Sequence, residues 1–402
     1  MVTLLRLGSS LLVIALLAVG AGAADTTFVS GTAEPSAAPV DAGGITSQSS
    51  AATALPSMST ARAAHTATRL LDGRVLIAGG VGSSLSYITA ELYEPAVHAF
   101  KPVADMRYGR FSHTATLLPS GSVLIAGGED QSRIPLSTAE LFVPASATFA
   151  LIRPMTTARV SHTATLLKTN SVLIAGGWDN TNGNATSSAS AELFNPATRT
   201  FKLTGSMNHP RASHSAVLLA DGLVLIIGGD AAGNTAEIYN PSTGKFSPTG
   251  SMLQARISFT ATLISGGNVL ITGGYWNGPT PLSSAEIYEP ATGRFSAISA
   301  MAHARAFHTA TALGDGTVLI AGGVSRLISS CDQNVWQLNS SVERFNPVTR
   351  QFTLNAVALT VARDSQTATL LSTGDVLLTG GYILVTKICY TGAVTATAET
   401  IR

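Results

Sequence analysis

Acidic and aromatic side chains that could bind or process a ligand follow a repeated Gly-Gly pair along the chain. They are Glu129, Asp130, Trp178, Asp179, Asp230, Tyr275, Trp276, Trp336 and Tyr382. All three Trp residues of the chain belong to this set, in segments predicted to be exposed loops. An aromatic ring stacks on the apolar face of a sugar, and a carboxylate accepts hydrogen bonds from its hydroxyls. The sequence therefore predicts carbohydrate recognition here, with packing of the Trp side chains on neighbouring loops as the alternative.

The acidic residues of this set could also be catalytic. A glycosidase or lyase requires two carboxylates at a defined separation, with the pKa of one of them raised. Glu129 and Asp230 belong to different repeats, and the sequence does not fix the distance between their carboxylates. An enzyme acting on carbohydrate is therefore the second hypothesis, and no catalytic residue is assigned.

A repeated unit organises most of the chain. An Arg precedes each Gly-Gly pair by 17 residues and a Glu follows each pair. The pairs recur at intervals of 45 to 58 residues, which is typical of stacked structural repeats. They are Gly79-Gly80, Gly127-Gly128, Gly176-Gly177, Gly228-Gly229, Gly273-Gly274, Gly322-Gly323 and Gly380-Gly381.

Each unit is predicted to form four short antiparallel strands. In the first unit the first three strands cover 65–71, 75–80 and 90–95, and the fourth begins at Phe100. Pairs such as Asp72-Gly73 favour tight two-residue turns between strands. Four strands at this period indicate one blade of a propeller. The predicted fold class is therefore all-β, a seven-bladed β-propeller spanning residues 50–402.

The seventh unit is expected to be completed from the N-terminal side. The sequence stops just after the third predicted strand of that unit. Met58 stands where Met106 and other Met residues end the fourth strands. A strand near residues 50–56 should therefore close the ring, weakly, because Ala52 occupies the position of the usual Phe.

Residues that recur in the units are expected to serve the architecture. The seven Arg residues could form an anion-binding ring, but the equal number of Glu residues favours ion pairs, since an unpaired buried charge is costly. A shared His position could suggest a metal ring, but Phe259 and Gln366 interrupt it. Packing and hydrogen bonding are therefore predicted, with no metal and no cofactor. The shared position holds His65, His113, His162, His214 and His308.

The unit resembles a known repeat family. Gly-Gly, Glu-x-aromatic, a later aromatic and Met-x-x-Ala-Arg-x-x-His are similar to the kelch repeat, with Phe where kelch units usually carry Trp. The string Ala-Arg-x-x-His-Thr-Ala-Thr-Leu-Leu resembles the propeller of the galactose oxidase and glyoxal oxidase family. That resemblance implies copper bound by two Tyr and two His, one His coming from a C-terminal domain. The chain has no Tyr-His dipeptide and ends at its last repeat, so we expect only the propeller to carry over.

The two Cys residues occupy equivalent positions in adjacent units. Cys331 and Cys389 each follow a Gly-Gly pair by eight residues. In an exported protein this arrangement predicts a disulfide between the sixth and seventh blades, and free thiols are the alternative.

The N-terminal segment has the features of an export signal. Arg6 precedes an apolar run from Leu11 to Val19, and Ala21-Gly22-Ala23 provides a cleavage pattern. Residues 1–24 are therefore predicted to be a signal peptide, with an uncleaved membrane anchor as the alternative. Residues 25–49 are rich in Ser, Thr, Ala, Gly and Pro and are predicted to be a linker. The protein is expected to be secreted or in the cell envelope, with no membrane segment after cleavage.

Composition narrows the choice of partner. The chain has 402 residues, of which only 12% are charged, and its formal net charge is +1. Nucleic-acid binding has little electrostatic support at this charge. Binding of a carbohydrate or an extracellular protein through the segments after Gly-Gly is the first functional hypothesis. A structural surface repeat protein is the third.

Overall fold

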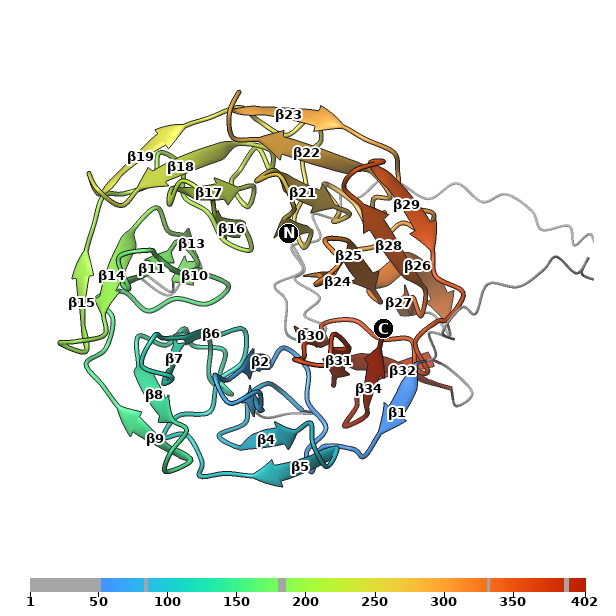
Figure 1. Cartoon of the computed structure of the whole chain (residues 1–402), viewed down its shortest axis with the longest axis horizontal. Coiled ribbons are helices and arrows are strands. Elements are labelled where there is room, and N and C mark those ends of the chain that lie inside the picture. The colour runs from blue at the N-terminus through green and yellow to red at the C-terminus, as the bar shows by residue number, and fades with distance from the viewer. Residues whose placement is uncertain (1–51, 83–85, 180–185, 331–332, 387–389) are drawn as a thin grey trace, which may run out of the picture.

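The computed structural model describes residues 52–82, 86–179, 186–330, 333–386 and 390–402. Every regular element in these ranges is a β-strand, so they contain no helix that could cross a membrane. Seven four-stranded sheets lie around a central axis as the blades of a propeller (Figure 1). The predicted all-β, seven-bladed fold is confirmed. The predicted signal peptide and linker, residues 1–24 and 25–49, lie outside the described residues.

Each of the first four blades is a continuous stretch of chain with its strands in sequence order. Blade 1 is β2 (Thr66–Arg69), β3 (Val75–Ala78), β4 (Ala90–Glu94) and β5 (Ala99–Pro102). Blade 2 is β6 (Thr114–Leu117), β7 (Val123–Ala126), β8 (Ala139–Val143) and β9 (Thr148–Leu151). Blade 3 is β10 (Thr163–Leu166), β11 (Val172–Ala175), β14 (Ala191–Asn195) and β15 (Thr200–Leu203). Blade 4 is β16 (Ser215–Leu218), β17 (Val224–Ile227), β18 (Ala236–Asn240) and β19 (Lys245–Pro248).

Blades 5 and 6 keep this order. Blade 7 takes its outermost strand from the N-terminal side of blade 1. Blade 5 is β20 (Thr260–Leu263), β21 (Val269–Thr272), β22 (Ala285–Glu289) and β23 (Arg294–Ala297). Blade 6 is β24 (Thr309–Ala312), β25 (Val318–Ala321), β28 (Val342–Asn346) and β29 (Gln351–Leu354). Blade 7 is β30 (Thr367–Leu370), β31 (Val376–Thr379), β34 (Ala398–Ile401) and β1 (Thr53–Leu55).

The ring is closed by pairing between distant parts of the chain. β1 pairs antiparallel with β34, with Ala54 opposite Glu399. This strand lies within the segment 50–56 where the repeat register placed it. The innermost strands of neighbouring blades also contact one another around the whole ring, including β2 with β30. Ala52, at the position of the usual Phe, still packs against the core between blades 6 and 7.

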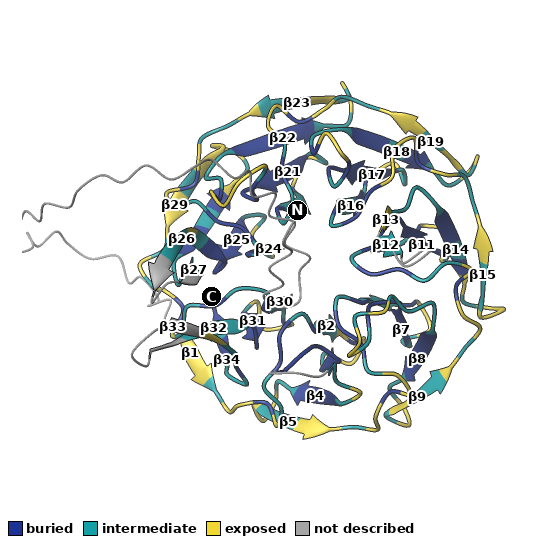
Figure 2. Cartoon of the chain, turned by 180° about the vertical axis from the view of Figure 1, so that it is seen from behind, coloured by how far each residue is buried: buried dark blue, intermediate teal, exposed yellow. Residues whose placement is uncertain are grey.

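The core consists of layers between adjacent blades. In β3, Val75 and Ile77 pack against blade 7, whereas Leu76 and Ala78 pack against blade 2. Because side chains alternate along a strand, a strand buried on both faces has a continuous apolar sequence. This explains the repeated Val-Leu-Ile-Ala. Figure 2 shows the result, with buried second and third strands, half-buried innermost strands, and exposed residues concentrated on the outer strands.

The first glycine of each Gly-Gly pair lies where one blade contacts the next. A Cβ atom at Gly127 would lie 2.5 Å from the Arg159 carbonyl oxygen and 2.6 Å from the His162 ring. Gly127 also has a φ of 61°, in the left-handed region that favours glycine. The N–H of the following Gly128 donates a hydrogen bond to the same Arg159 carbonyl at 2.9 Å. Close contact between blades therefore requires glycine at this position.

The segments between each Gly-Gly pair and the third strand of its blade form one surface, here called the loop face. In six of the seven blades, the residue after the pair forms a backbone bridge with the residue after the repeat Arg, as Glu129 does with Phe111. Three of these segments contain extra hairpins, and strand β27 contacts β32 and β33. The hairpins are β12 (Trp178–Asp179) with β13 (Thr186–Ser187), β26 (Val324–Ser330) with β27 (Gln333–Leu338), and β32 (Tyr382–Thr386) with β33 (Tyr390–Val394).

Candidate functional site

The repeated Arg and Glu residues form buried ion pairs within each blade, as predicted. Nitrogen–oxygen distances are 2.7 to 3.1 Å, and each Arg also donates to the carbonyl of the first glycine in its pair. All seven Arg side chains are therefore paired with groups of their own blades and do not form an anion-binding ring. The pairs are Arg62–Glu91, Arg110–Glu140, Arg159–Glu192, Arg211–Glu237, Arg256–Glu286, Arg305–Glu343 and Arg363–Glu399.

The shared His position joins neighbouring blades. The Nε2 atom of each His lies 2.9 to 3.0 Å from a Thr hydroxyl of the preceding blade, as His113 does with Thr66. Gln366 takes the same role by donating to the Ala321 carbonyl oxygen at 3.0 Å. Burial, reinforced by nearby Arg residues, lowers the pKa of His65 and His214 to about 3. These residues are therefore neutral and have the packing and hydrogen-bonding roles predicted from the sequence.

A ring of backbone with positive φ surrounds the channel, two residues after each repeat Arg. Its φ values lie between 50° and 54°, and six of the seven junctions carry a hydrogen bond from an N–H to the carbonyl of the preceding blade. Five positions are Ser and one is Ala, but blade 6 has Phe307. The ring residues are Ala64, Ser112, Ser161, Ser213, Ser258, Phe307 and Ser365. A bulky side chain is rarely found in this backbone region, so Phe307 stands out.

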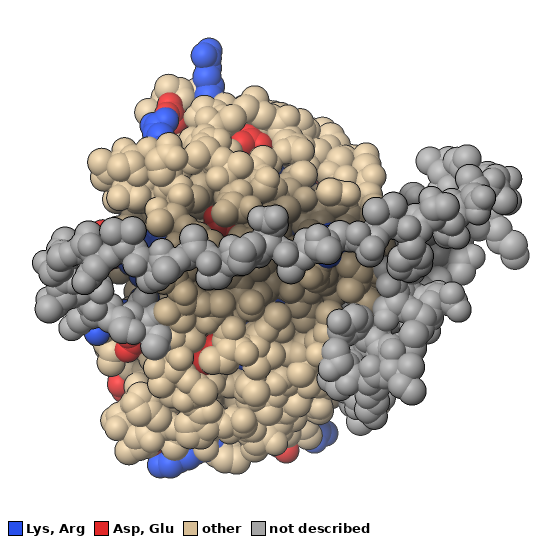
Figure 3. Space-filling model, turned by 90° about the vertical axis from the view of Figure 1, so that its right-hand side faces the viewer, with Lys and Arg blue, Asp and Glu red and all other residues tan. Residues whose placement is uncertain are grey.

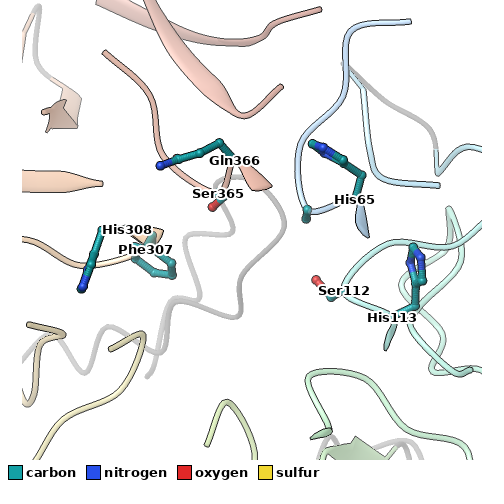
Figure 4. Close-up of a pocket in the computed structure, with 8 residues that line it drawn as sticks. His65, Ser112, His113, Phe307, His308, Ser365 and Gln366 are labelled. Carbon is teal, nitrogen blue, oxygen red and sulfur yellow. The ribbon is translucent and has the colours of Figure 1, made fainter. Parts of the chain in front are cut away.

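The ring borders a cavity of about 280 Å³ at the end of the channel nearest the loop face, here called the channel mouth. Figure 4 shows its lining side chains, with Phe307 and Ser365 from blades 6 and 7 opposite Ser112 from blade 2. The Ser112 hydroxyl thus lies across the opening from the Phe307 ring, whereas the His and Gln366 side chains are hydrogen-bonded to the preceding blades. The lining residues are Ala64, His65, Ser112, His113, Phe307, His308, Ser365 and Gln366.

Three aromatic side chains continue from the channel mouth across blades 5 and 6. The Tyr275 ring lies with its centroid 5.7 Å from that of Phe307 and 6.2 Å from that of Trp336. Burial raises the pKa of Tyr275 to about 12, although a hydrogen bond with Ser258 opposes this rise. Its phenol is therefore neutral at physiological pH. We call Tyr275, Phe307 and Trp336 the aromatic wall.

The structure brings only part of the predicted aromatic set together. Tyr275 and Trp336 belong to the aromatic wall, whereas Trp276 lies against Gly233 of blade 4, where a Cβ atom would be 2.6 Å from the indole. Trp178 lies in the β12–β13 hairpin of blade 3, and Tyr382 pairs through its backbone with Asp364. The expectation of exposed loop aromatics was wrong. Trp178 and Trp336 lie in hairpin strands, Tyr275 is buried, and the other four aromatic side chains are half-buried, because the extra hairpins and neighbouring loops cover them.

The predicted acidic residues organise the loops of their own blades. Asp130 accepts hydrogen bonds from the backbone N–H groups of Ser132 and Ile134. Glu129 lies 3.6 Å from Arg133, and Asp179 accepts a hydrogen bond from Thr186 at 2.7 Å.

The Asp230 carboxylate also has its contacts within its own blade. It accepts a hydrogen bond from the Thr235 hydroxyl at 3.0 Å and lies 3.6 Å from Arg211. Each predicted acid thus has a local structural contact, which gives no support to a catalytic carboxylate pair.

Two residues at the site were missed in the sequence. Phe307 lies in the ring, and Asp364 lies one residue before ring residue Ser365. Aligning the seven units position by position identifies both, because the other units have Ser or Ala at the Phe307 position and apolar residues at the Asp364 position. Phe307 and Asp364 precede the Gly-Gly pair of their units, whereas the predicted aromatic and acidic residues follow it.

Cys331 and Cys389, the residues of the predicted disulfide, lie outside the described residues. The hairpins that contain the two positions are in contact through β27 with β32 and β33.

The copper set implied by the oxidase resemblance does not fit the described residues. Among them, no three His, Cys, Asp or Glu side chains are grouped so as to hold a metal ion. The His Nε2 atoms at the channel are engaged by Thr hydroxyls, and the Tyr275 phenol is hydrogen-bonded to Ser258.

Charge is sparse on the surface. Figure 3 shows one side of the molecule, where Lys, Arg, Asp and Glu side chains are scattered without a continuous basic patch. This agrees with the formal net charge of +1.

Comparisons with known proteins agree with this architecture. The family model of the kelch motif matches residues 256–302, which run from the repeat Arg of blade 5 to the residue after Met301. No curated protein matches the chain. Among solved structures, a fungal alcohol oxidase of the AA5 family in complex with copper has 16% sequence identity and a TM-score of 0.69, over 88% of this chain and 76% of that chain. The chain is a seven-bladed β-propeller that matches the kelch motif in blade 5, and its fold resembles that of this oxidase.

Proposed function

We propose that this propeller is an extracellular binding module that recognises a carbohydrate at the channel mouth. The observation that carries the proposal is Phe307. It is a bulky aromatic residue at a φ of 54°, in a ring where the other six blades have Ser or Ala, and it lines the cavity. Strained backbone of this kind persists where the structure or the function requires it.

The surroundings of Phe307 have the chemistry that sugar recognition needs. Phe307 and Trp336 flank Tyr275 and offer aromatic surface to the apolar face of a sugar. Ser112 and Ser365 add hydroxyl groups that hydrogen-bond to the hydroxyls of a sugar.

The size of the cavity limits what it could hold. Its volume of about 280 Å³ is small compared with roughly 300–1,000 Å³ for sites of drug-sized ligands. A single sugar residue, free or within a chain that extends over the aromatic wall, suits this space.

A titration that follows tryptophan fluorescence tests the proposal. The protein from about Asp25 onward is titrated with a panel of soluble glycans, and at least one class should produce a saturable change. Trp336→Phe should remove most of that change, because Trp336 is the Trp in the aromatic wall, whereas Trp178→Phe should preserve it. A panel without any saturable response would contradict carbohydrate binding and favour a protein partner.

Export is part of the proposal and leads to a separate prediction. In protein recovered from an oxidising compartment, we expect Cys331 and Cys389 to be disulfide-bonded, and the contact between their hairpins supports this. Peptide mass spectrometry without reduction should detect the linked peptide. In the chain-entropy model, the bond stabilises the fold by roughly 4 kcal/mol, so Cys331→Ser should lower the Tm. Two free thiols in the exported protein would contradict the prediction.

A further inference from the structure

Asp364 breaks the repeat at a position that is otherwise apolar. The residue directly after the repeat Arg is Asp only in blade 7. In the other units, this position is occupied by Ala63, Phe111, Val160, Ala212, Ile257 and Ala306, and all but Ile257 are buried. The fold therefore does not require a carboxylate here.

Short contacts link the Asp364 carboxylate to the channel mouth. Its Oδ1 accepts a hydrogen bond from the Ser365 hydroxyl at 2.8 Å, and Ser365 lines the cavity. The Ser365 N–H in turn donates to the Phe307 carbonyl oxygen at 3.2 Å. On the other side, the backbone of Asp364 pairs with that of Tyr382 in β32. The carboxylate is thus one hydrogen bond away from a residue that lines the cavity.

No cationic side chain among the described residues forms an ion pair with Asp364. The guanidinium of the adjacent Arg363 pairs with Glu399 at 3.0 Å and also donates to Gly380 and Thr397. The eight residues that line the cavity are neutral, because burial keeps their His side chains unprotonated. A half-buried carboxylate without a cation is unfavourable, and burial raises the pKa of Asp364 to about 7 against the opposing Ser365 hydrogen bond.

We infer that the ligand carries a protonated amine, so that its class is an amino sugar with a free amino group. This inference rests on the proposed function, because it assumes that the channel mouth binds a sugar. The ammonium group has three N–H donors, which suit the Asp364 carboxylate and the Ser365 hydroxyl. The face of Phe307 attracts a cation as well. A charge-assisted hydrogen bond of this type is roughly twice as strong as a neutral one.

Binding of a matched pair of oligosaccharides tests the inference. β-1,4-linked glucosamine oligomers and their N-acetylated counterparts of equal length are titrated by calorimetry at pH 7. The free-amine oligomer should bind about tenfold or more tightly, the ratio expected for one additional charge-assisted hydrogen bond. Asp364→Ala, which installs the residue of blades 1, 4 and 6, should abolish this preference.

The possible results separate the two proposals. Equal affinity for both oligomers, or a preference that survives Asp364→Ala, would overturn the inference about the amine while leaving carbohydrate binding intact. Binding of neither these oligomers nor any other glycan would overturn both. Asp364→Asn provides a second variant of nearly the same shape, and it should also lose the preference.

A stability measurement establishes that Asp364→Ala is folded and reports on the carboxylate itself. The pKa of Asp364 is about 7 in the folded state, above the ordinary value of 3.8, so the folded state holds its proton more tightly than the unfolded state. The resulting penalty is absent below pH 3.8 and grows until about pH 7. The Tm of Asp364→Ala should therefore exceed that of the wild type at pH 7 to 8 by more than at pH 3.5. An equal difference at both pH values would remove the evidence for a strained carboxylate at this position.

Discussion

Replacing Glu192 by Ala should lower the free energy of unfolding by about 3–5 kcal/mol, the cost of removing one partner of a buried ion pair. The Glu192 carboxylate lies 2.9 Å from Arg159, and both side chains are fully buried. It also accepts hydrogen bonds from the backbone N–H groups of Thr156 and Thr157, which hold the chain where it enters blade 3. The variant would leave the Arg159 charge buried without its partner.

Chemical denaturation of Glu192→Ala measures this cost, and an exposed ion pair provides the control. Asp315 lies 2.9 Å from Arg344, but the Asp315 side chain is 54% exposed. Asp315→Asn should therefore cost less than about 1 kcal/mol, as is usual for surface pairs. Equal losses in the two variants would show that the buried pairs do not stabilise the propeller as described.

Replacing Gly127 by Ala should have a comparable effect, about 2–5 kcal/mol, from steric overlap combined with an unfavourable φ. The new Cβ atom would lie 2.5 Å from the Arg159 carbonyl oxygen and 2.6 Å from the His162 ring. Blade 3 would have to move away from blade 2 to relieve this overlap. Because both neighbouring groups belong to the rigid contact between blades, we expect only partial relief.

Gly374→Ala separates the steric cost from the backbone cost. Gly374 has a φ of 89°, but no atom lies within 4 Å of the position of its Cβ. Its replacement should cost about 1–2 kcal/mol, the penalty for a left-handed backbone alone. Thermal unfolding of both variants gives the comparison. Losses of similar size would indicate that contact between blades is not the reason for glycine at the first position of the pair.

The fold could be predicted because its signals repeat. A single Arg–Glu pair or Gly-Gly pair would be weak, but seven copies in one register specify four strands per blade and seven blades. The register even indicated a closing strand near residues 50–56, where β1 pairs with β34. Packing between blades depends on alternation within Val-Leu-Ile-Ala, which is visible in the sequence.

The candidate site was harder to predict, because exposure and convergence depend on how the loops fold. Trp276 was expected to be exposed but covers Gly233, and Asp230 was expected to face a ligand but lies beside Arg211. Neither contact can be predicted from the spacing of residues in the sequence, since each joins residues of different loops or strands. Phe307 and Asp364 were visible only as departures from a repeat, and their positions at the channel mouth depend on the closed ring.

The most direct test of the central claim compares two variants in which a residue that breaks the repeat is replaced by the residue that other blades carry. Phe307→Ser removes the aromatic residue that lines the cavity, whereas Phe259→His changes an aromatic residue of blade 5 that does not line it. Both substitutions restore a residue that the fold accommodates in other blades. Affinity for the best glycan of the panel is measured by calorimetry. We predict a loss of about tenfold or more for Phe307→Ser, corresponding to one aromatic contact, and unchanged affinity for Phe259→His. Wild-type affinity in Phe307→Ser would contradict a binding site at the channel mouth.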